Sequence, residues 1–588
     1  MSMSTFLIYS VSILILGLYL LARYNEVDDY GLSSSSSSAV VSSRQLYGNF
    51  LHITDLHPDP HYQINATFKS RCHKKLRRFG VNNNEIDNYH EIEEGTYANK
   101  PKHMKHGISG VWGGPASICD TPMSLINATF DWLKQEWADK IDFVLWTGDN
   151  SRHDNDDRIP RKNPEILKMN RVIASKFQET FSRPDKNSPK MIPIIPVIGN
   201  NDIYPSNIIT PGPNNILQKL SEIWSPFIPK SEMSTFRKGG YYATEVIKDK
   251  LIVVSLNTLY FFRMNTAVQG CSDRSQPGTE QIKWLNKLLL KAKKQHKKVY
   301  LIGHVAPTKK RYTRTCWNKY GKLAQKYHDV ILGHFFGHSN MDHFYFIRST
   351  KKENDLNDDL DDENDLDSED EPEYETFDED EPEYETFDED EEEIMPPFDY
   401  ADDDDNDGII YTNLLKTEKF GSKLLRHYRQ VPSLNNMAVS QHSVIHVNPS
   451  VIPTFYPAVR VFQYHTNKDA ENIERRKGRK NKQKYPKNNN YLIPYNYIQY
   501  FMNLTHANLD LYSTNRPTFQ IEYTTRDDYN MTDLSTHSWL KLAKRIVRDA
   551  REDGPLFKKF KDHMVVSTRE MVDDRIKKGW IKNINNDS

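Results

Sequence analysis

The chain has 588 residues, of which 37% are hydrophobic and 27% are charged, so it can bury a substantial core but cannot pack all of its length inside one. Its formal net charge of −2 conceals an uneven distribution, because residues 353–407 hold 32 Asp or Glu and no Lys or Arg. The rest of the chain sets 78 basic residues against 48 acidic ones, a net charge of +30. A basic body suits a polyanionic partner, although both parts could simply be solvated.

A nearly uncharged apolar run close to the N-terminus predicts a membrane segment. Residues 6–22 (FLIYSVSILILGLYLLA) number 17, near the lower limit of about 17–25 for one span. The preceding residues 1–5 lack the basic residues of a signal-peptide n-region, and no clear Ala-x-Ala cleavage site follows. We therefore expect an uncleaved single-pass anchor rather than a signal peptide, and then a flexible Ser-rich stalk over 23–48.

Sequons after this segment predict its orientation. Asn-x-Ser/Thr sequons are spread along the following region, at Asn65, Asn127, Asn503, Asn530 and Asn586. We expect a glycosylated type II membrane protein whose folded region lies in a lumen.

The cysteines fit an oxidising lumen. There are four, an even number within the region predicted to fold: Cys72, Cys119, Cys271 and Cys316. Pairing Cys72 with Cys119 and Cys271 with Cys316 is the simplest of three connectivities, and free buried thiols are the alternative.

The folded region is predicted to begin at Asn49 and to alternate strands with helices. Apolar or alternating runs predict strands over 50–54, 141–147, 193–198, 241–259, 299–302, 330–335, 443–446 and 456–464. Periodic patterns predict helices over 122–138, capped by Thr121, and over 164–181, 280–295, 317–327 and 538–550. This order predicts an α/β fold of layered sheets and helices.

The acidic block interrupts this pattern. It contains an identical tandem repeat, residues 370–379 followed by 380–389, and its composition forbids a packed core. Because strand-like segments resume afterwards, we interpret 351–408 as a disordered insertion within a catalytic domain spanning 49–350 and 409–588. The basic loop 475–487 is expected to be disordered too.

Five short polar motifs each follow an apolar run, so they would lie at strand ends, where functional sites are commonly built. In chain order they are Asp55-Leu56-His57, Gly148-Asp149-Asn150, Gly199-Asn200-Asn201-Asp202, Gly303-His304 and Gly337-His338-Ser339-Asn340. Their carboxylates, amides and imidazoles predict a metal cage.

Such a cage suits phosphoester or phosphoanhydride chemistry. Two divalent ions about 3.5–4 Å apart can bind a hydroxide between them, neutralise phosphoryl oxygens and support in-line displacement at phosphorus. Asp149 is the natural bridging carboxylate, because it follows the most hydrophobic strand in a Gly-Asp-Asn turn. Asp55 and His57 can reach one ion together. The other ion would be held by Asn200, His304 and His338.

With these residues in place, the chain resembles the calcineurin-like metallophosphoesterase superfamily and, within it, the acid sphingomyelinase-like branch. The resemblance rests on Thr54-Asp55-Leu56-His57, on Gly-Asp-x-x-x-His over 148–153 and on Phe336-Gly337-His338. Longer segments over 50–59, 148–154 and 333–338, with the anchor and the acidic insertion, are similar to vacuolar endopolyphosphatases. The resemblance implies a β-sandwich flanked by helices and two divalent ions, whether zinc, manganese, magnesium, cobalt or iron.

Two residues depart from the superfamily pattern. Asn201 replaces the histidine that usually helps to protonate the leaving group, so we expect His153 to supply that proton, an ordinary surface histidine being the alternative. Asn340 replaces a second histidine and would be a weaker ligand at the Asp55 ion. His334 is an alternative to His338 as the metal ligand of this segment. We choose His338 because it keeps the correct spacing to Asn340.

The predicted function is a metal-dependent endopolyphosphatase at the vacuole membrane, hydrolysing internal phosphoanhydride bonds of long-chain inorganic polyphosphate by attack of a metal-bound hydroxide. Two basic groups lie close in sequence to the site loops: Arg71, Lys74, Lys75, Arg77 and Arg78, and Lys309, Lys310, Arg311 and Arg314. They would bind the polyanion in many registers, or form a solvated face.

Other partners and functions follow from the same features. The acidic insertion would imitate the substrate until a processing protease or salt releases it, or would serve only as a solubilising loop. No nucleic acid is expected. The alternative functions are a sphingomyelinase-like or nucleotide phosphodiesterase and a non-catalytic, membrane-tethered polyanion-binding protein.

Overall fold

The computed structural model describes residues 46–75, 108–182, 191–348, 406–435, 439–466, 492–509, 516–552 and 554–569, with 406–416 described by their backbone alone. The predicted anchor, most of the stalk and acidic insertion, and the basic loop lie outside these ranges. Within the described ranges, no helix is both long and apolar enough to cross a membrane. All of these residues belong to one compact unit that begins at Leu46.

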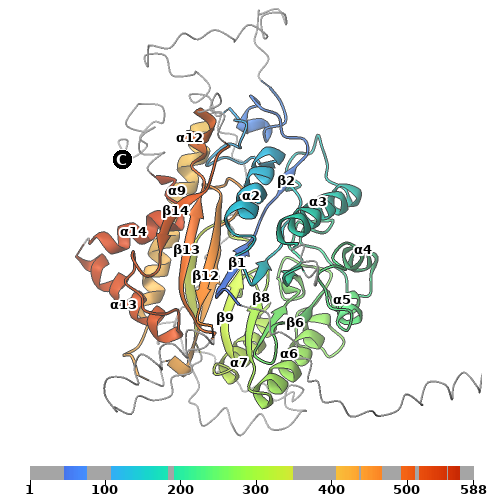
Figure 1. The fold of residues 1–588 in the computed structure, drawn as a ribbon, viewed down its shortest axis with the longest axis vertical. Helices are drawn as coiled ribbons and strands as arrows, with labels where there is room; N and C mark the ends of the chain where they lie inside the picture. Colours follow the sequence, from blue (N-terminus) through green and yellow to red (C-terminus); the bar gives the residue numbers. More distant parts are fainter. Residues whose placement is uncertain are drawn as a thin grey trace, which may run out of the picture. The chain divides into compact units, whose positions relative to one another are not determined.

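The first of two six-stranded sheets carries the first strand of the chain, β1, near its centre (Figure 1). Its order is β14 (Gln520–Thr524), β13 (Pro494–Phe501), β12 (Ala458–Tyr464), β1 (Asn49–Ile53), β4 (Phe143–Trp146) and β5 (Ile194–Pro196). β1, β4 and β5 run parallel, whereas β12, β13 and β14 add antiparallel neighbours. Strands from the last third of the chain therefore complete the sheet that begins with β1.

The second sheet is parallel at its centre and antiparallel at both edges. Its order is β10 (His343–Arg348), β11 (His442–Val447), β9 (Ile331–Phe336), β8 (Lys298–Ile302), β7 (Leu251–Ser255) and β6 (Tyr242–Ile247). Only the β10–β11 and β6–β7 pairs are antiparallel. Because β10 and β11 pair directly, the chain leaves and re-enters the same sheet across the acidic block. A third, short sheet pairs β2 (Pro58–Asp59) with β3 (Thr121–Pro122).

Aromatic side chains fill the space between the two large sheets. The ring of Phe50, on β1, stacks on Phe143 at 4.9 Å and on Phe462 at 4.8 Å within its own sheet. The same ring also lies 5.4 Å from Tyr300 on β8 and 5.8 Å from Phe335 on β9. All five side chains are buried, so the sheets pack face to face as a sandwich around this cluster.

Helices cover the sandwich on its outer faces. They are α2 (Met123–Glu136), α3 (Asn163–Phe181), α4 (Asn215–Ile223), α5 (Met233–Gly239), α6 (Pro277–Lys294), α7 (Arg314–Lys326), α9 (Asn406–Arg429), α12 (Leu504–Leu509), α13 (Thr536–Arg551) and α14 (Pro555–Met564). Figure 1 shows α13 and α14 beside the β12–β14 side of the molecule. The predicted α/β fold of sheets flanked by helices is confirmed.

Two local predictions were wrong. Thr121 does not cap α2, because it lies in β3, and Pro122 occupies the cap position without a side-chain hydrogen bond. The predicted strand over 241–259 is a hairpin, β6 and β7, whose strands are joined at 248–250. A short helix, η4 (Thr258–Tyr260), follows the hairpin. The charged residues 248–250 (Lys-Asp-Lys) separate the two apolar runs and form the turn, a break that the prediction of a single strand passed over.

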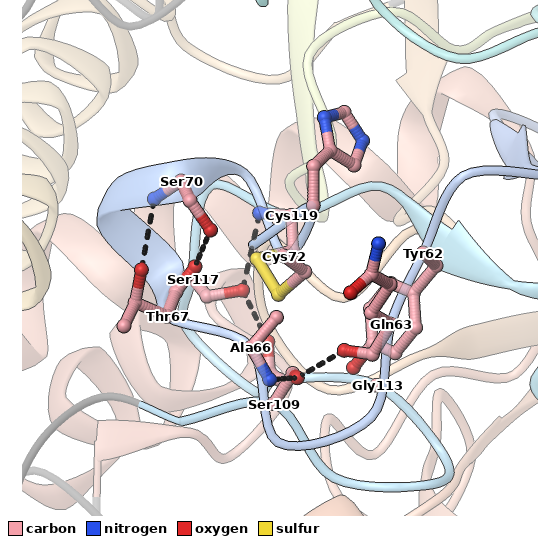
Figure 2. Close-up of a disulfide and its surroundings, with 12 residues drawn as sticks. Tyr62, Gln63, Ala66, Thr67, Ser70, Cys72, Ser109, Gly113, Ser117 and Cys119 are labelled. Carbon is pink, nitrogen blue, oxygen red and sulfur yellow. Dashed lines mark hydrogen bonds between the residues drawn. A yellow bond between two sulfur atoms is a disulfide. The ribbon is translucent and has the colours of Figure 1, made fainter. Parts of the chain in front are cut away.

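Both disulfides form with the predicted pairing, Cys72–Cys119 and Cys271–Cys316. Figure 2 shows the first, next to the short helix η1 (Phe68–Ser70), whose Ser70 N–H donates to the Thr67 hydroxyl at 3.2 Å. This disulfide belongs to a small apolar cluster separate from the main core. It therefore ties a surface loop to the segment that leads into β3.

Candidate metal centre

The candidate ligands lie directly after adjacent strands, as the sequence predicts. Asp55 and His57 follow β1, Asp149 follows β4 and Asn200 follows β5 in the first sheet. In the second sheet, the loop after β8 carries His304 and the loop after β9 carries His338 and Asn340. Since neighbouring parallel strands end at the same edge of a sheet, these loops from both sheets meet at one place.

Asp149 is the centre of this arrangement. Its Oδ2 lies 3.3 Å from His57 Nε2 and 3.2 Å from His304 Nε2, so one carboxylate faces imidazoles from both sheets. Burial alone would raise the pKa of Asp149, but the charges of His304 and His57 hold it well below its usual value. Conversely, burial would lower the pKa of His304, but Asp149 raises it to about 9. These shifts mark a carboxylate shared between two groups of ligands.

We call the first group the Asp55 half: Asp55, His57 and Asp149, to which we assign Asn340 on its predicted position in the sequence. Ligand atoms of Asp55, His57 and Asp149 lie within 4.8 Å of one another. Among the described residues, Asp55 Oδ1, His57 Nε2 and Asn340 Oδ1 are buried without a hydrogen-bond partner. Buried acceptors left in this way are costly unless something else satisfies them, and a divalent cation would do so. The donor set therefore fits a metal ion.

The second group is the Asn200 half: Asn200, His304 and His338, with Asp149. Asn200 Oδ1 lies 2.8 Å from both His304 Nε2 and His338 Nδ1, and these two ring nitrogens are 3.2 Å apart. Ligand atoms of Asp149, His304 and His338 also lie within 4.8 Å of one another. An amide oxygen and two imidazoles converging on one carboxylate suit a second divalent ion.

The backbone is strained at five of the seven candidate ligands. Positive φ values, rare for residues other than glycine, occur at Asp55 (50°), His57 (40°), Asp149 (60°), His338 (70°) and Asn340 (53°). Such conformations cost about 1–3 kcal/mol each and persist where the surroundings enforce them, most often at functional sites.

Glycines let these loops approach one another closely. A Cβ at Gly199 would overlap Asp149, and a Cβ at Gly337 would overlap Thr54 and Asp55. The glycines of two predicted motifs are therefore needed for the ligand loops to meet.

Asp202, which the sequence motif contained without a role, joins the Asp149 and Asn200 loops. Its carboxylate accepts the N–H groups of Asp149 at 3.0 Å, Asn150 at 2.8 Å and Gly199 at 2.8 Å. Asn170 on α3 also donates to it, at 3.1 Å. Asp202 thus fixes the relative position of two ligand loops through their backbones, a role that no spacing rule predicts.

Asn201 turns towards the central carboxylate. Its N–H donates to Asp149 Oδ1 at 2.7 Å and its side-chain Nδ2 to Asp149 Oδ2 at 2.9 Å. The side-chain oxygen accepts from Ser206 Oγ at 3.0 Å and from the buried Arg161 at 3.3 Å. Arg161 also donates to the Asn201 carbonyl at 2.7 Å. These contacts orient the amide with its NH2 group towards Asp149.

His153 lies beside the Asp55 half. Its ring stacks on the His57 ring, with centroids 4.1 Å apart and an interplanar angle of 11°. Asp120 accepts from the His153 backbone N–H at 3.0 Å and lies 2.7 Å from its Nδ1. The His153 side chain is 23% exposed, so it borders both the ligand cluster and solvent.

The structure brings His338, and not the competing His334, into the cluster. His334 is buried within the second sheet, where its Nδ1 lies 2.7 Å from the Tyr320 hydroxyl. Asp120 was not among the residues singled out from the sequence. Its position directly after Cys119, the partner of Cys72, is the only local signal that could have placed it near His153.

The chain matches two protein families. Residues 48–341 match the calcineurin-like phosphoesterases, and residues 433–584 match the acid sphingomyelin phosphodiesterase C-terminal region. The first match ends after the last candidate ligand, and the second begins shortly before β11. The C-terminal match thus contains β11 to β14 and the helices α13 and α14.

The chain is similar to several fungal endopolyphosphatases. That of Cryptococcus neoformans is 38% identical over 74% of this chain and 60% of its own length. That of Neurospora crassa is 31% identical over 87% of this chain and 79% of its own length. That of Schizosaccharomyces pombe is 31% identical over 88% of this chain and 86% of its own length.

Coverage differs among these relatives. The chain spans only 60% of the C. neoformans protein and 57% of a Yarrowia lipolytica endopolyphosphatase, but most of the two longer matches. The calcineurin-like phosphoesterase match, residues 48–341, includes every candidate ligand. On the family match over half of its length and on these relatives, the chain belongs to the calcineurin-like phosphoesterases and, within them, to the endopolyphosphatase family.

Proposed function

We propose that the protein is a metal-dependent endopolyphosphatase that hydrolyses internal phosphoanhydride bonds of inorganic polyphosphate. The observation that carries the proposal is the single carboxylate of Asp149, shared between two groups of ligands from two sheets. The Asp55 half and the Asn200 half would each hold one divalent ion. Two ions bound there would lower the pKa of a water and neutralise charge on phosphoryl oxygens.

Residues of this chain would then orient the centre and move protons. Asn201 donates two hydrogen bonds to Asp149, which keeps both carboxylate oxygens in place. An amide N–H is too weak an acid to transfer its proton, so Asn201 positions the bridge rather than protonating the leaving group. His153, held by Asp120 at Nδ1, has its Nε2 left to protonate the leaving phosphate oxygen.

The substrate and the compartment are supported by charge and by the disulfides. The basic body, at +30 outside the acidic block, suits a long polyanion, and the two disulfides suit the lumen of the secretory pathway. Sequons at Asn65, Asn127 and Asn530 are exposed. We propose a luminal, glycosylated domain held at the vacuole membrane by residues 6–22.

A second candidate function is phosphodiester hydrolysis. The match of residues 433–584 to the acid sphingomyelin phosphodiesterase C-terminal region favours it. The same metal ligands could cleave either bond, so the choice depends on the substrate-binding surface and not on the ions.

One assay separates the candidates. The purified protein is incubated with long-chain polyphosphate and with bis(p-nitrophenyl) phosphate under several divalent ions, and product length is followed on gels. Early mid-length polyphosphate supports the proposal, whereas phosphodiester cleavage alone supports the second candidate. Asp149→Ala should lose at least about a thousandfold in activity, because it removes the shared ligand of both ions. Lys291→Gln, on the exposed face of α6, is the surface control.

A further inference from the structure

Two groups of basic residues lie on the structure near the ligand loops. The first, the Arg71 flank, consists of Lys69, Arg71, Lys74 and Lys75, in and just after η1. The second, the Arg311 flank, consists of Arg263, Lys309, Lys310 and Arg311, in two loops that run side by side before α7. The question is where each flank lies relative to the two halves of the centre.

The Arg71 flank lies at the Asp55 end. Arg71 Nε donates to the Asn155 carbonyl at 3.1 Å, in the loop that carries His153. Arg71 also interacts electrostatically with Asp120, the residue that holds His153. The His153 ring in turn stacks on His57. A series of contacts therefore leads from this flank to the Asp55 half.

The Arg311 flank lies beside His338, in the Asn200 half. The Phe262 ring meets the His338 ring edge-on, with centroids 5.7 Å apart. Directly after Phe262, Arg263 donates its N–H to the Arg311 carbonyl at 2.7 Å and its Nη2 to the Lys309 carbonyl at 3.0 Å. Arg311 also interacts electrostatically with His338. This flank therefore adjoins the Asn200 half.

Between the flanks lies the metal centre itself. From the Asp55 end to the Asn200 end, His57 Nε2 is 3.3 Å from Asp149, and Asp149 is 3.2 Å from His304 Nε2. His304 Nε2 is 3.2 Å from His338 Nδ1. Asp149 thus lies between the two halves, with the Arg71 flank beside the Asp55 half and the Arg311 flank beside the Asn200 half.

A separate disulfide secures each flank. Cys72, next to Arg71, is bonded to Cys119, next to Asp120, so one bridge joins the flank to the support of His153 (Figure 2). Cys271–Cys316 joins the loop that follows Arg263 to the first turn of α7, just after Arg311. Loops that would otherwise move are thereby fixed beside the two ends of the centre.

We propose that the two flanks form a two-sided track for a polyphosphate chain, which binds on both sides of the bond that is cleaved. This inference rests on the proposed function and adds how the substrate chain is positioned across the metal centre. When a bond near a chain end is cleaved, one flank holds no phosphates, and the attraction between that flank and the substrate is lost. Internal bonds are therefore preferred. The ends of a linear polyphosphate are equivalent, so either flank can hold either end.

The test removes one charge from each flank and varies substrate length. The variants are Arg71→Gln and Arg311→Gln, with the exposed Lys74→Gln and Lys309→Gln as second variants in case the half-buried Arg71 or the buried Arg311 is needed for folding. Lys291→Gln on α6 is the matched control, outside both flanks. The substrates are long-chain polyphosphate and tripolyphosphate, each at low and high salt.

We expect each flank variant to lose about 3–10-fold in kcat/KM on long chains at low salt, mainly through KM, with a smaller loss on tripolyphosphate. Early products of each flank variant should contain more tri- and tetraphosphate than those of the wild type, because cleavage near an end no longer forgoes a contact. Lys291→Gln should match the wild type.

The outcomes separate the two proposals. A wild-type protein that cleaves only a phosphodiester overturns the proposed function and the track with it. A wild-type protein that cleaves polyphosphate, with folded flank variants that keep its KM and product lengths, overturns the track alone. Loss at only one flank also overturns the two-sided track, since both sides are required.

Discussion

The two halves of the metal centre share Asp149 but differ in whether their ligand atoms have hydrogen-bond partners. In the Asn200 half, the amide oxygen and the two ring nitrogens lie 2.8–3.2 Å from one another. In the Asp55 half, one atom each of Asp55, His57 and Asn340 is buried without a hydrogen-bond partner among the described residues. The Asn200 half can therefore hold its shape through internal contacts, whereas the Asp55 half depends more on an ion.

The difference has a local cause. Asp55 keeps only one oxygen engaged, which accepts from the Thr54 hydroxyl at 2.5 Å and from the His338 N–H at 3.0 Å. His57 Nδ1 donates a hydrogen bond to the Ser151 carbonyl at 3.0 Å, which directs Nε2 towards the ligand cluster. Each residue is thus anchored through one atom while another is left for a cation, as expected when outer contacts orient metal ligands.

The largest expected effect is the loss of stability when the metal ions are removed, which tests the comparison between the two halves. Chelation followed by dialysis should lower the free energy of unfolding by about 4 kcal/mol relative to protein with free ion near a thousand times Kd. For a domain of this size, that is a fall in melting temperature of about 5 °C. Calorimetry with and without added zinc, manganese or magnesium measures it.

Asp149→Ala provides the control for this experiment, since a protein without the shared ligand should gain little stability from added ion. Equal melting temperatures for chelated and ion-loaded wild type would contradict the dependence of the Asp55 half on a cation.

The next largest effect concerns the proton donor beside the Asp55 half. His153→Gln should reduce kcat on polyphosphate by about a hundredfold, in the lower part of the usual range for a general acid. Asp120→Asn should have a smaller effect, about tenfold, because the ring keeps its stacking on His57 but loses its charged partner. Steady-state kinetics at saturating ion measures both.

Metal content should stay at the wild-type value in His153→Gln, because His153 is not proposed as a ligand. A variant that loses bound ion along with activity, or that keeps kcat within about threefold, would contradict the role of His153.

Asn340 sharpens the comparison between the halves directly. Asn340→Leu removes the free amide oxygen and should weaken ion binding in the Asp55 half about tenfold, whereas Asn340→His should strengthen it by a similar factor. The metal content of each protein, measured after dialysis against limiting zinc, reports the difference. Occupancy of the Asn200 half should be the same in all three proteins and serves as the internal control.

If Leu and His at position 340 bind ion equally well, Asn340 Oδ1 does not contribute a ligand. The buried amide oxygen would then need another partner.

The convergence of the candidate ligands could be predicted because each follows an apolar run, and the ends of adjacent parallel strands meet in space. Asp149 and His304 illustrate this, since the apolar run that precedes each of them can be recognised from neighbouring residues in the sequence. Asp120 and Asp202 could not be predicted, because they act on backbone groups of loops that are distant in sequence. Asn201 was named from its motif, and it contacts Asp149, but that contact depends on Arg161 and Ser206, which no motif links to it.

The fold shows the same limit. The central strands of both sheets were predicted, because they are continuous apolar runs. β13 and β14 were not, since polar residues such as Gln499 and Glu522 interrupt them. Gln499 Nε2 donates to Glu522 at 2.8 Å between these strands, a contact that exists only once the strands pair.

The smallest expected effect is that of changing Ser206, which supports Asn201 beside the shared carboxylate of Asp149. Ser206 Oγ donates to Asn201 Oδ1 and so helps to keep the amide NH2 group on Asp149. Ser206→Ala removes one neutral hydrogen bond, worth about 0.5–1.5 kcal/mol, while Arg161 still contacts the same oxygen. We expect a fall in kcat of about 2–5-fold, with metal content unchanged, and Ser206→Thr should retain activity because it keeps the hydroxyl. Equal activity of Ser206→Ala and wild type would mean that Arg161 alone orients the amide, and an equal loss in Ser206→Thr would point to packing of this loop instead of the hydrogen bond.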